Sequence, residues 1–254
     1  MNIWILALII LVIAIFMTMT GHGGGNFFVI ALVLSGIEMH VAATTGQFIL
    51  FTAAFFAMLV FGKKKFVEWK LAVFIGVLIG ISAFSGGFFS FLFFIALLMF
   101  KPVKKDANQV LKTGWMYWNI KSVDKNNVYP VSLILIVPIV LGFGFVAGVA
   151  GMVGISGGSF LVPLLVLSCR VPMKNAVGTA STLVAVSALA GFVGHTLSGH
   201  FDYRIAIPVA IGGAIGGLIG GSIAIQTKPK LLKILFALTT LVAAIIMAFK
   251  VFIH

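Results

Sequence analysis

The feature that most constrains this chain is a series of long apolar stretches, separated by short segments that hold almost all of its charges. Because the hydrocarbon core of a bilayer is about 30 Å thick, a helix of roughly 20 apolar residues can cross it. The sequence therefore predicts an all-α integral membrane protein with about eight transmembrane helices. The predicted stretches are Ile3–Met19, Ala42–Phe61, Leu71–Phe84, Phe88–Phe100, Pro130–Val153, Ala176–Leu197, Ile205–Ile225 and Leu231–Ile253.

The composition agrees with a membrane protein. Of the 254 residues, 61% are hydrophobic and 9% are charged, whereas an ordinary soluble domain carries roughly a quarter charged residues. A chain of this length cannot hide so large an apolar excess inside a water-facing shell. The first stretch lacks the basic segment and the cleavage site of a signal peptide, so we interpret it as a retained span. Most of the chain is therefore expected to lie in the lipid bilayer.

The basic residues lie mainly in the short loops. The net charge is +12, from 17 Lys and Arg against 5 Asp and Glu. Loops are where the positive-inside rule places basic residues, and helices surrounded by lipid form no basic face for nucleic acid, so no nucleic-acid partner is expected. We counted the two sides for eight crossings with both termini in the cytoplasm. This count places twelve basic residues in the cytoplasm: Lys63, Lys64, Lys65, Lys70, the six lysines of the connector, Arg204 and Lys250. It places five outside: Arg170, Lys174, Lys228, Lys230 and Lys233.

The two halves of the chain resemble each other at a nearly constant offset. The segment Gly21–Val29 aligns with Gly154–Val162 at an offset of 133, and Glu68-Trp69-Lys70 aligns with Asp202-Tyr203-Arg204 at 134. A duplicated architecture is typical of transporters. We therefore predict a first transmembrane repeat at 1–100, a basic polar connector at 101–129 and a second repeat at 130–254, which makes two homologous four-helix halves.

Glycine-rich motifs lie in both halves where a transmembrane helix should pass. Glycine disfavours a continuous helix, so we predict broken or re-entrant helices, with the short apolar runs Phe27–Gly36 and Phe160–Cys169 as half-helices. The N-terminus of such a half-helix presents free N–H groups and a positive dipole to an anion. Asn26 and Ser159 are predicted to be the N-cap residues. The alternative is close packing of helices through small residues, which we expect for the glycines at 212–221.

Hydroxyl and amide side chains follow each half-helix. These neutral groups suit an oxyanion that must also leave again, although each hydroxyl could instead bond to the backbone of its own helix. Thr182 belongs to the group that follows the half-helix of the second half of the chain. The predicted substrate-binding residues are Gly24, Gly25, Asn26, Thr44, Thr45, Gln47, Gly157, Gly158, Ser159, Thr179 and Ser181.

The titratable residues are few. His22 lies inside the first glycine motif and is a candidate for proton coupling, with a hydrogen-bonded structural histidine as the alternative. The histidine spacings match no zinc motif, so no metal site is predicted. No nucleotide-binding motif occurs, so no cofactor is predicted. Glu68 and Asp202 are expected to anchor helix ends at the membrane interface, each with the basic residue two positions later.

Two other functions remain open at the level of sequence. Residues 154–158 read G-x-S-x-G, so Ser156 with His195 as its base would make an intramembrane serine protease. Ser156 corresponds to Gly23 in the first half, however, so this serine is not common to the two halves. The other possibility is an anion channel, in which the same residues would line an open pore.

At these motifs the chain resembles the sulfite exporter TauE/SafE family, also called the 4-toluene sulfonate uptake permease family. The resemblance covers nearly the whole chain and rests on Gly21–Gly25, Gly154–Pro163, Asn175–Ser181 and Gly199–Tyr203. It implies a multi-pass permease of the inner (plasma) membrane for sulfite, sulfonates, related organosulfur anions or organic acids. Transport would proceed by alternating access, driven by an ion gradient with H+ as the candidate coupling ion. The oligomeric state is not fixed by these motifs.

Overall fold

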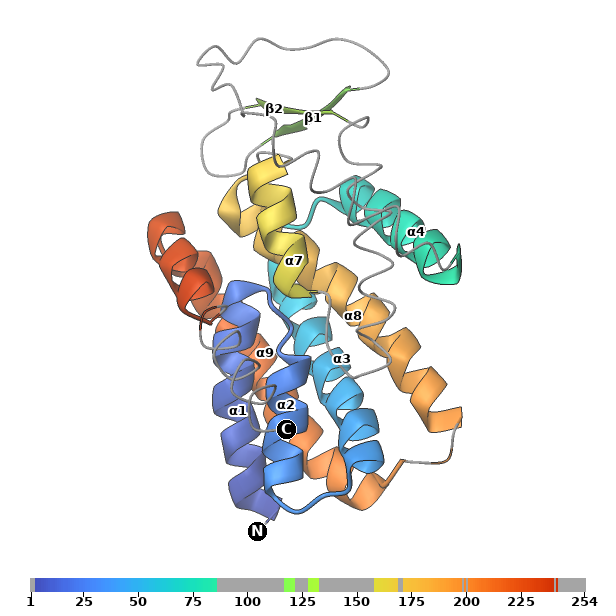
Figure 1. Ribbon diagram of the computed structural model, residues 1–254. Helices are drawn as coiled ribbons and strands as arrows, with labels where there is room; N and C mark the ends of the chain where they lie inside the picture. The colour runs from blue at the N-terminus through green and yellow to red at the C-terminus, as the bar shows by residue number, and fades with distance from the viewer. Residues whose placement is uncertain are drawn as a thin grey trace.

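The computed structural model describes residues 3–85, 117–121, 128–132, 158–168, 171–197, 199, 201–239 and 241. Within this part, four helices are long and apolar enough to cross a membrane: α1 (Ile3–Thr20), α3 (Met39–Lys63), α8 (Met173–Leu197) and α9 (Tyr203–Gln226). Each coincides with a predicted stretch. The prediction of a multi-pass, helical membrane protein is confirmed (Figure 1).

Shorter elements complete the described part. They are α2 (Gly25–Leu34), α4 (Trp69–Ser85), α7 (Gly158–Pro163), the π-helix η1 (Leu164–Ser168), and helical residues 229–239. Strands β1 (Tyr117–Lys121) and β2 (Val128–Ser132) form one antiparallel hairpin with Tyr117 opposite Ser132. β2 takes the first residues of the predicted stretch Pro130–Val153. The rest of that stretch and all of Phe88–Phe100 lie outside the described residues, and the division into repeats and connector stays a prediction.

Helix α9 lies between α1 and α3 and contacts both through glycines (Figure 1). Gly212, Gly216 and Gly220 face α1, and Gly213, Gly217 and Gly221 face α3. Glycines four residues apart line up on one helix face, and the missing side chains let the backbones approach closely. A Cβ atom at Gly216, for example, would lie 2.5 Å from the Cβ of Ala14. The packing interpretation of these glycines is therefore confirmed.

The contacts also fix the relative directions of the helices. Along α9, Gly212, Gly216 and Gly220 meet Ala7, Leu11 and Ile15 of α1 in that order. Similarly, Gly213, Gly217 and Gly221 meet Ile49, Ala53 and Ala57 of α3. Helices α1, α3 and α9 therefore run in the same direction. Helix α8 runs opposite to α3, because its Gly178 contacts Phe61 near the end of α3, whereas its Gly191 contacts Gln47 near the beginning.

Since α1 and α3 run in the same direction, the segment between them must lead back from one end of the bundle to the other. Helix α2 forms the second part of this return. Its Val29 packs against Gly46, in the first third of the 25-residue α3. Helix α2 therefore lies beside the first half of α3 and begins near the middle of the bundle. The predicted break and half-helix in the first half are confirmed.

The return through α2 corrects the predicted distribution of charges. Helix α8 starts where α3 ends, and Nζ of Lys174 lies 5.7 Å from the ring centroid of Phe66 in the α3–α4 loop. Because α9 is parallel to α3, Lys228 follows the end of α9 on that same side, whereas Arg204 begins α9 on the opposite side. The prediction that placed Arg204 with Lys63 and opposite Lys174 and Lys228 is wrong, because it omitted the crossing made by residues 21–34. We name this side the lysine end, and its basic residues are Lys63, Lys64, Lys65, Lys70, Lys174, Lys228, Lys230 and Lys233.

The lysine end is expected to face the cytoplasm by the positive-inside rule. The measurement is the labelling of single cysteines, in a Cys169→Ser background, with a membrane-impermeant maleimide. Lys64→Cys should react in inside-out vesicles and Asp202→Cys in right-side-out vesicles. The opposite pattern would reverse this orientation.

Candidate functional site

The first break is built from glycines that no other residue could replace without strain. Helix α1 ends at Thr20, and Gly24, the N-cap of α2, has φ +80°. This left-handed conformation favours glycine, and a Cβ at Gly24 would also lie 2.5 Å from Cγ of Met17. The prediction that Asn26 is the N-cap is wrong. The turn into α2 is made by the left-handed backbone of Gly24, without any side-chain cap, so Asn26 becomes the second residue of the helix.

Two buried side-chain oxygens in the described part have no hydrogen-bond partner, and both belong to predicted substrate-binding residues. They are Oδ1 of Asn26 on α2 and Oγ1 of Thr45 on α3. Thr45 is 0% exposed, and α2 packs against α3. A buried polar group without a partner costs about 1–3 kcal/mol. Such groups in a native structure call for an explanation, and a bound ligand is one.

The other predicted hydroxyls are already bonded. Oγ1 of Thr44 donates to the carbonyl of His40 at 3.0 Å, and Oγ of Ser181 donates to that of Val177 at 2.9 Å. Oγ1 of Thr182 likewise donates to Gly178 at 3.1 Å. Backbone bonding, the alternative considered above, therefore occupies the protons of these three hydroxyls. A ligand beside them would meet an oxygen rather than a proton.

Gln47 and Thr179 both lie at contacts between α8 and the first half, but Gln47 packs near the end of α8 and Thr179 lies near its beginning, so the structure does not bring these two predicted residues together. A Cβ at Gly191 of α8 would lie 3.2 Å from Cδ of Gln47, so the glycine makes room for the buried amide. Oγ1 of Thr179 accepts a hydrogen bond from the backbone N–H of Glu68 at 3.1 Å. Nδ2 of Asn175, one turn before Thr179 on α8, donates to Oε1 of Glu68 at 2.9 Å.

Sequence reasoning missed this role of Glu68. The sequence predicted that Glu68 and Asp202 both anchor helix ends at the membrane interface. Asp202 caps its own helix by accepting from the N–H of Arg204 at 2.9 Å. The carboxylate of Glu68 instead bonds to Asn175 in the other half of the chain. The only signal in the sequence was that Asn175 opens one of the motifs that carry the family resemblance, Asn175–Ser181.

The second glycine motif leads into a distorted helix. Helix α7 begins at Gly158, includes Ser159 and ends at Pro163, after which η1 continues as a π-helix. Proline has no N–H and its ring crowds the carbonyl one turn earlier, which favours a distortion of the helix at this point. Gly157 lies outside the described residues. The two motif regions are in contact, because a Cβ at Gly21 would lie 3.0 Å from Cγ2 of Val162 in α7.

His22 lies within the first break and is 2% exposed. Its Nδ1 lies 3.0 Å from Oγ1 of Thr20, and its ring centroid lies 4.0 Å from that of Phe236 in the helical segment 229–239. The imidazole is thus held between a hydroxyl and an aromatic ring. This environment fits the structural alternative, and it leaves proton coupling through His22 untested.

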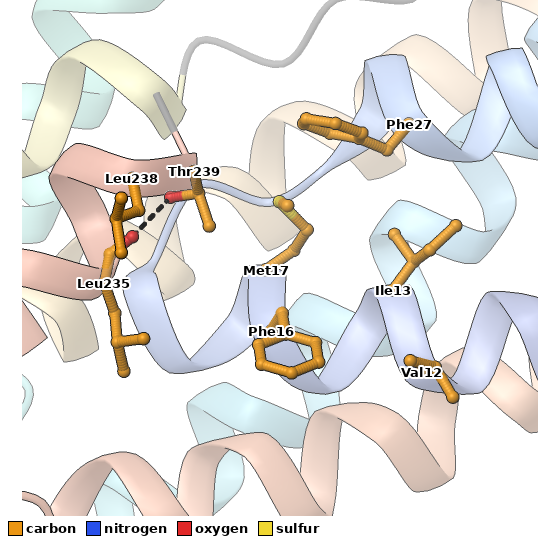
Figure 2. A pocket seen from close by; sticks show the side chains of 8 residues that line it. All are labelled: Val12, Ile13, Phe16, Met17, Phe27, Leu235, Leu238 and Thr239. Carbon is orange, nitrogen blue, oxygen red and sulfur yellow. Dashed lines mark hydrogen bonds between the residues drawn. The ribbon is translucent and has the colours of Figure 1, made fainter. Parts of the chain in front are cut away.

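An apolar cavity lies beside the break (Figure 2). Its volume is about 310 Å³, and it is lined by Val12, Ile13, Phe16, Met17, Phe27, Leu235, Leu238 and Thr239. The hydroxyl of Thr239 is the only polar side-chain group among these residues, and it donates to the carbonyl of Leu235 at 3.0 Å. The cavity therefore offers no side-chain donor to an anion, and we do not place the substrate there.

Comparisons with known proteins identify the family of the chain. The sequence model of the family described as sulfite exporter TauE/SafE matches residues 5–247. A probable membrane transporter protein of Bacillus subtilis, YunE, is 25% identical over 217 residues, which cover 75% of this chain and 77% of that protein. A probable membrane transporter protein of Methanocaldococcus jannaschii, MJ0441, is 21% identical over 215 residues, covering 79% and 76%. No solved structure matches the chain at a comparable level of significance.

Proposed function

Because the chain belongs to the sulfite exporter TauE/SafE family, a family of membrane transporters, we propose that it carries a small sulfur-containing anion across the inner (plasma) membrane. Family membership makes the chain a multi-pass membrane transporter and not an enzyme. The protease alternative therefore has no support; Ser156 lies outside the described residues. Sulfite, sulfonates and related organic acids are the proposed substrates, and alternating access is the proposed mechanism.

The observation that carries the proposal is the pair of unpartnered polar groups beside the first break. The first N–H groups of a helix have no partner within it, so the N-terminus of α2 offers backbone donors and a positive dipole end near the middle of the bundle. Thr45 has a hydroxyl proton to donate, and the amide of Asn26 presents its NH₂ group when turned by half a rotation. Together these groups could bind the oxygens of a sulfite or sulfonate.

The second half is proposed to supply the matching side of this site. The first residues of α7, α8 and α9 follow those of α2, α3 and α4 by 133, 134 and 134 positions, the offsets found in the sequence. The antiparallel course of α3 and α8 is what an inverted repeat requires. We therefore propose that Gly157, Gly158 and Ser159 face Gly24, Gly25 and Asn26 across the substrate. Side chains of α3 and α8 would contact the anion at two levels along its path, since Gln47 lies level with Gly191 of α8 and Phe61 with Gly178. Thr44, Thr45 and Gln47 form the first level, and Thr179 and Ser181 form the second, roughly 18 Å nearer the lysine end.

The packing of α9 limits how such a transporter could move. Helix α9 belongs to the second half of the sequence, but it is inserted between α1 and α3 of the first. Rocking one sequence half against the other would separate the closest backbone contacts of the bundle. We therefore propose that α1, α3 and α9 move as one block. In this mechanism the contacts of this block with α8 are the ones that change between the inward- and outward-open states.

Thr45→Val should lower substrate affinity without lowering stability. Valine has nearly the shape of threonine but no hydroxyl, and a hydrogen bond to a charged group contributes about 1.5–3 kcal/mol. The concentration for half-maximal flux should therefore rise on the order of tenfold or more. The measurement is the uptake of labelled sulfite and of a small alkyl sulfonate into proteoliposomes, together with thermal stability in detergent.

Thr52→Val is the matched control, because the hydroxyl of Thr52 on the same helix already donates to the carbonyl of Ile49 at 2.9 Å. Its substrate affinity should equal that of the wild type. An unchanged affinity in Thr45→Val would remove Thr45 from the site. Counterflow, the uptake of labelled anion driven by unlabelled anion inside, separates a carrier from the anion-channel alternative, since a channel shows none.

Proton coupling through His22 is part of the proposal. An imposed pH gradient should then drive uptake in the wild type but not in His22→Asn, which keeps a polar group beside Thr20 but cannot take up a proton near neutral pH. Equal gradient-driven uptake by the two proteins would assign His22 a structural role only.

A further inference from the structure

The loop between α3 and α4 is docked on the beginning of α8 by several independent contacts. Helix α3 ends in a tight turn in which the N–H of Phe66 donates to the carbonyl of Phe61 at 3.0 Å. Phe66 and Val67 are buried, and Gly178 of α8 leaves room for the carbonyl of Phe66, which would lie 2.7 Å from a Cβ there. The chain then reaches Glu68, whose two hydrogen bonds to α8 were described above.

Glu68 is a carboxylate residue that is hydrogen-bonded to buried residues of a distant helix, α8. Asn175 and Thr179, its two partners, are 1% and 0% exposed, so both bonds are shielded from water on the α8 side. Glu68 itself is half-buried and lies outside the membrane-spanning helices, where it can exchange a proton with water. Thr179 is also a proposed substrate-binding residue. The hydrogen-bonded cluster at the lysine end therefore includes one residue of the proposed substrate path.

We propose that Glu68 is a regulatory proton site separate from the proposed coupling at His22, which holds the α3–α4 loop on α8 when ionised and releases it when protonated. This inference rests on the proposed function. An amide donates a stronger hydrogen bond to a carboxylate than to a neutral carboxyl group. When the carboxylate takes a proton from water at the lysine end, its bond with Asn175 weakens, and the block of α1, α3 and α9 can separate from α8 there. The proton returns to water when the loop docks again.

The surroundings of Glu68 are compatible with this role. Burial raises the pKa of its carboxyl group, and the hydrogen bond from Asn175 opposes that rise. The charged groups nearest in the chain or across the contact are Lys63 at the end of α3, Lys64 and Lys65 in the loop, Lys70 on α4 and Lys174 on α8. The α1–α2 break, which packs on Val177 through Gly21, brings His22 to the same region, with its ring against Thr20 and Phe236.

The experiment compares pH profiles of anion exchange for the wild type, Glu68→Gln and Asp202→Asn in proteoliposomes with equal pH on both sides. Wild-type exchange should rise as the pH falls. Glu68→Gln keeps the hydrogen-bond acceptor but cannot ionise, so its exchange should stay at the acid-limit level throughout. Asp202→Asn, the acid at the repeat-related position, should keep the wild-type profile because Asp202 only caps α9. Dividing each profile by that of the wild type cancels any titration of the substrate.

A second variant tests the same contact from the α8 side. Asn175→Ala removes the bond that ionisation strengthens, so the loop is released at every pH and exchange should stay at the acid-limit level throughout. A contact that only supports the fold predicts the pH profile of the wild type. If Glu68→Gln does not fold, the profile of Asn175→Ala decides between the two.

A Glu68→Gln profile parallel to that of the wild type, or a wild-type pH dependence in Asn175→Ala, would overturn this inference and leave the proposed function intact. Absence of saturable exchange in the wild type for sulfite and for ethanesulfonate would overturn the proposed function, and this inference with it.

Discussion

Gly217→Ala is expected to destabilise the bundle by about 3 kcal/mol, the upper part of the usual range for overpacking a filled interior. A Cβ at Gly217 would collide with the carbonyl oxygen of Ala53 on α3. The colliding atom is backbone, which cannot turn aside as a flexible side chain would. Van der Waals packing is a main source of helix association in lipid, so the displaced contact is not replaced by a hydrophobic gain. The measurement is the fraction of monodisperse protein that survives heating in detergent.

Gly221→Ala provides the control, one turn further along the same face of α9. There the nearest atoms, Cα of Ala57 and Cβ of Val60, would lie 3.4 Å from the new Cβ, an ordinary contact distance. Alanine is also the better helix former by about 1 kcal/mol. Gly221→Ala should therefore match or slightly exceed the wild type in stability. Equal losses in the two variants would show that the glycines serve helix flexibility rather than close approach.

Gly24→Ala is expected to lower transport on the order of tenfold or more while the protein still inserts and folds, because a shift of 1.4 kcal/mol already changes an equilibrium tenfold. The substitution has two separate effects. A left-handed conformation costs a residue with a Cβ about 1–2 kcal/mol, and the new Cβ would overlap Met17. The strain is relieved by moving the N-terminus of α2, which is the proposed anion-binding element. The measurement is counterflow of labelled sulfite.

Two further variants separate these effects. Gly36 also has a left-handed backbone, with φ +88°, but a Cβ there meets no atom within 4 Å. Gly36→Ala should therefore reduce stability by the conformational cost alone and leave transport nearly unchanged. Adding Met17→Ala to Gly24→Ala removes the overlap, so part of the lost flux should return. Wild-type flux in Gly24→Ala would remove the first break from the transport site.

The helices and the first break were predictable from local sequence. In lipid, every backbone polar group must be satisfied within its own helix, so apolar length alone identifies a span such as Met39–Lys63. A run of glycines ends a helix in any surroundings. The N-cap of α2 was predicted to be Asn26, but it is Gly24. The starting point of this helix depends on how Met17 packs against Gly24, which the sequence does not show.

The candidate site was predictable only in part. Thr45 and Asn26 followed from their position beside the break, and their unpartnered oxygens agree with that prediction without testing it. The contact of Glu68 with Asn175 joins residues 107 positions apart. No periodicity or spacing carries such a contact, since each residue is ordinary in its own segment and acquires its partner only when α8 packs against the α3–α4 loop.

The sequence by itself determined that this protein lies in a membrane, where its first break falls, and which faces of α9 allow close approach, because hydropathy and glycine spacing act within one helix. Only the tertiary structure decided the directions of the helices, the side on which the lysines gather, and the insertion of α9 between α1 and α3. Direction depends on counting every crossing, and residues 21–34 cross with a helix too short to be recognised by its apolar length. The choice of neighbours depends on backbone contacts between segments that are distant in the sequence, such as Ala53 with Gly217.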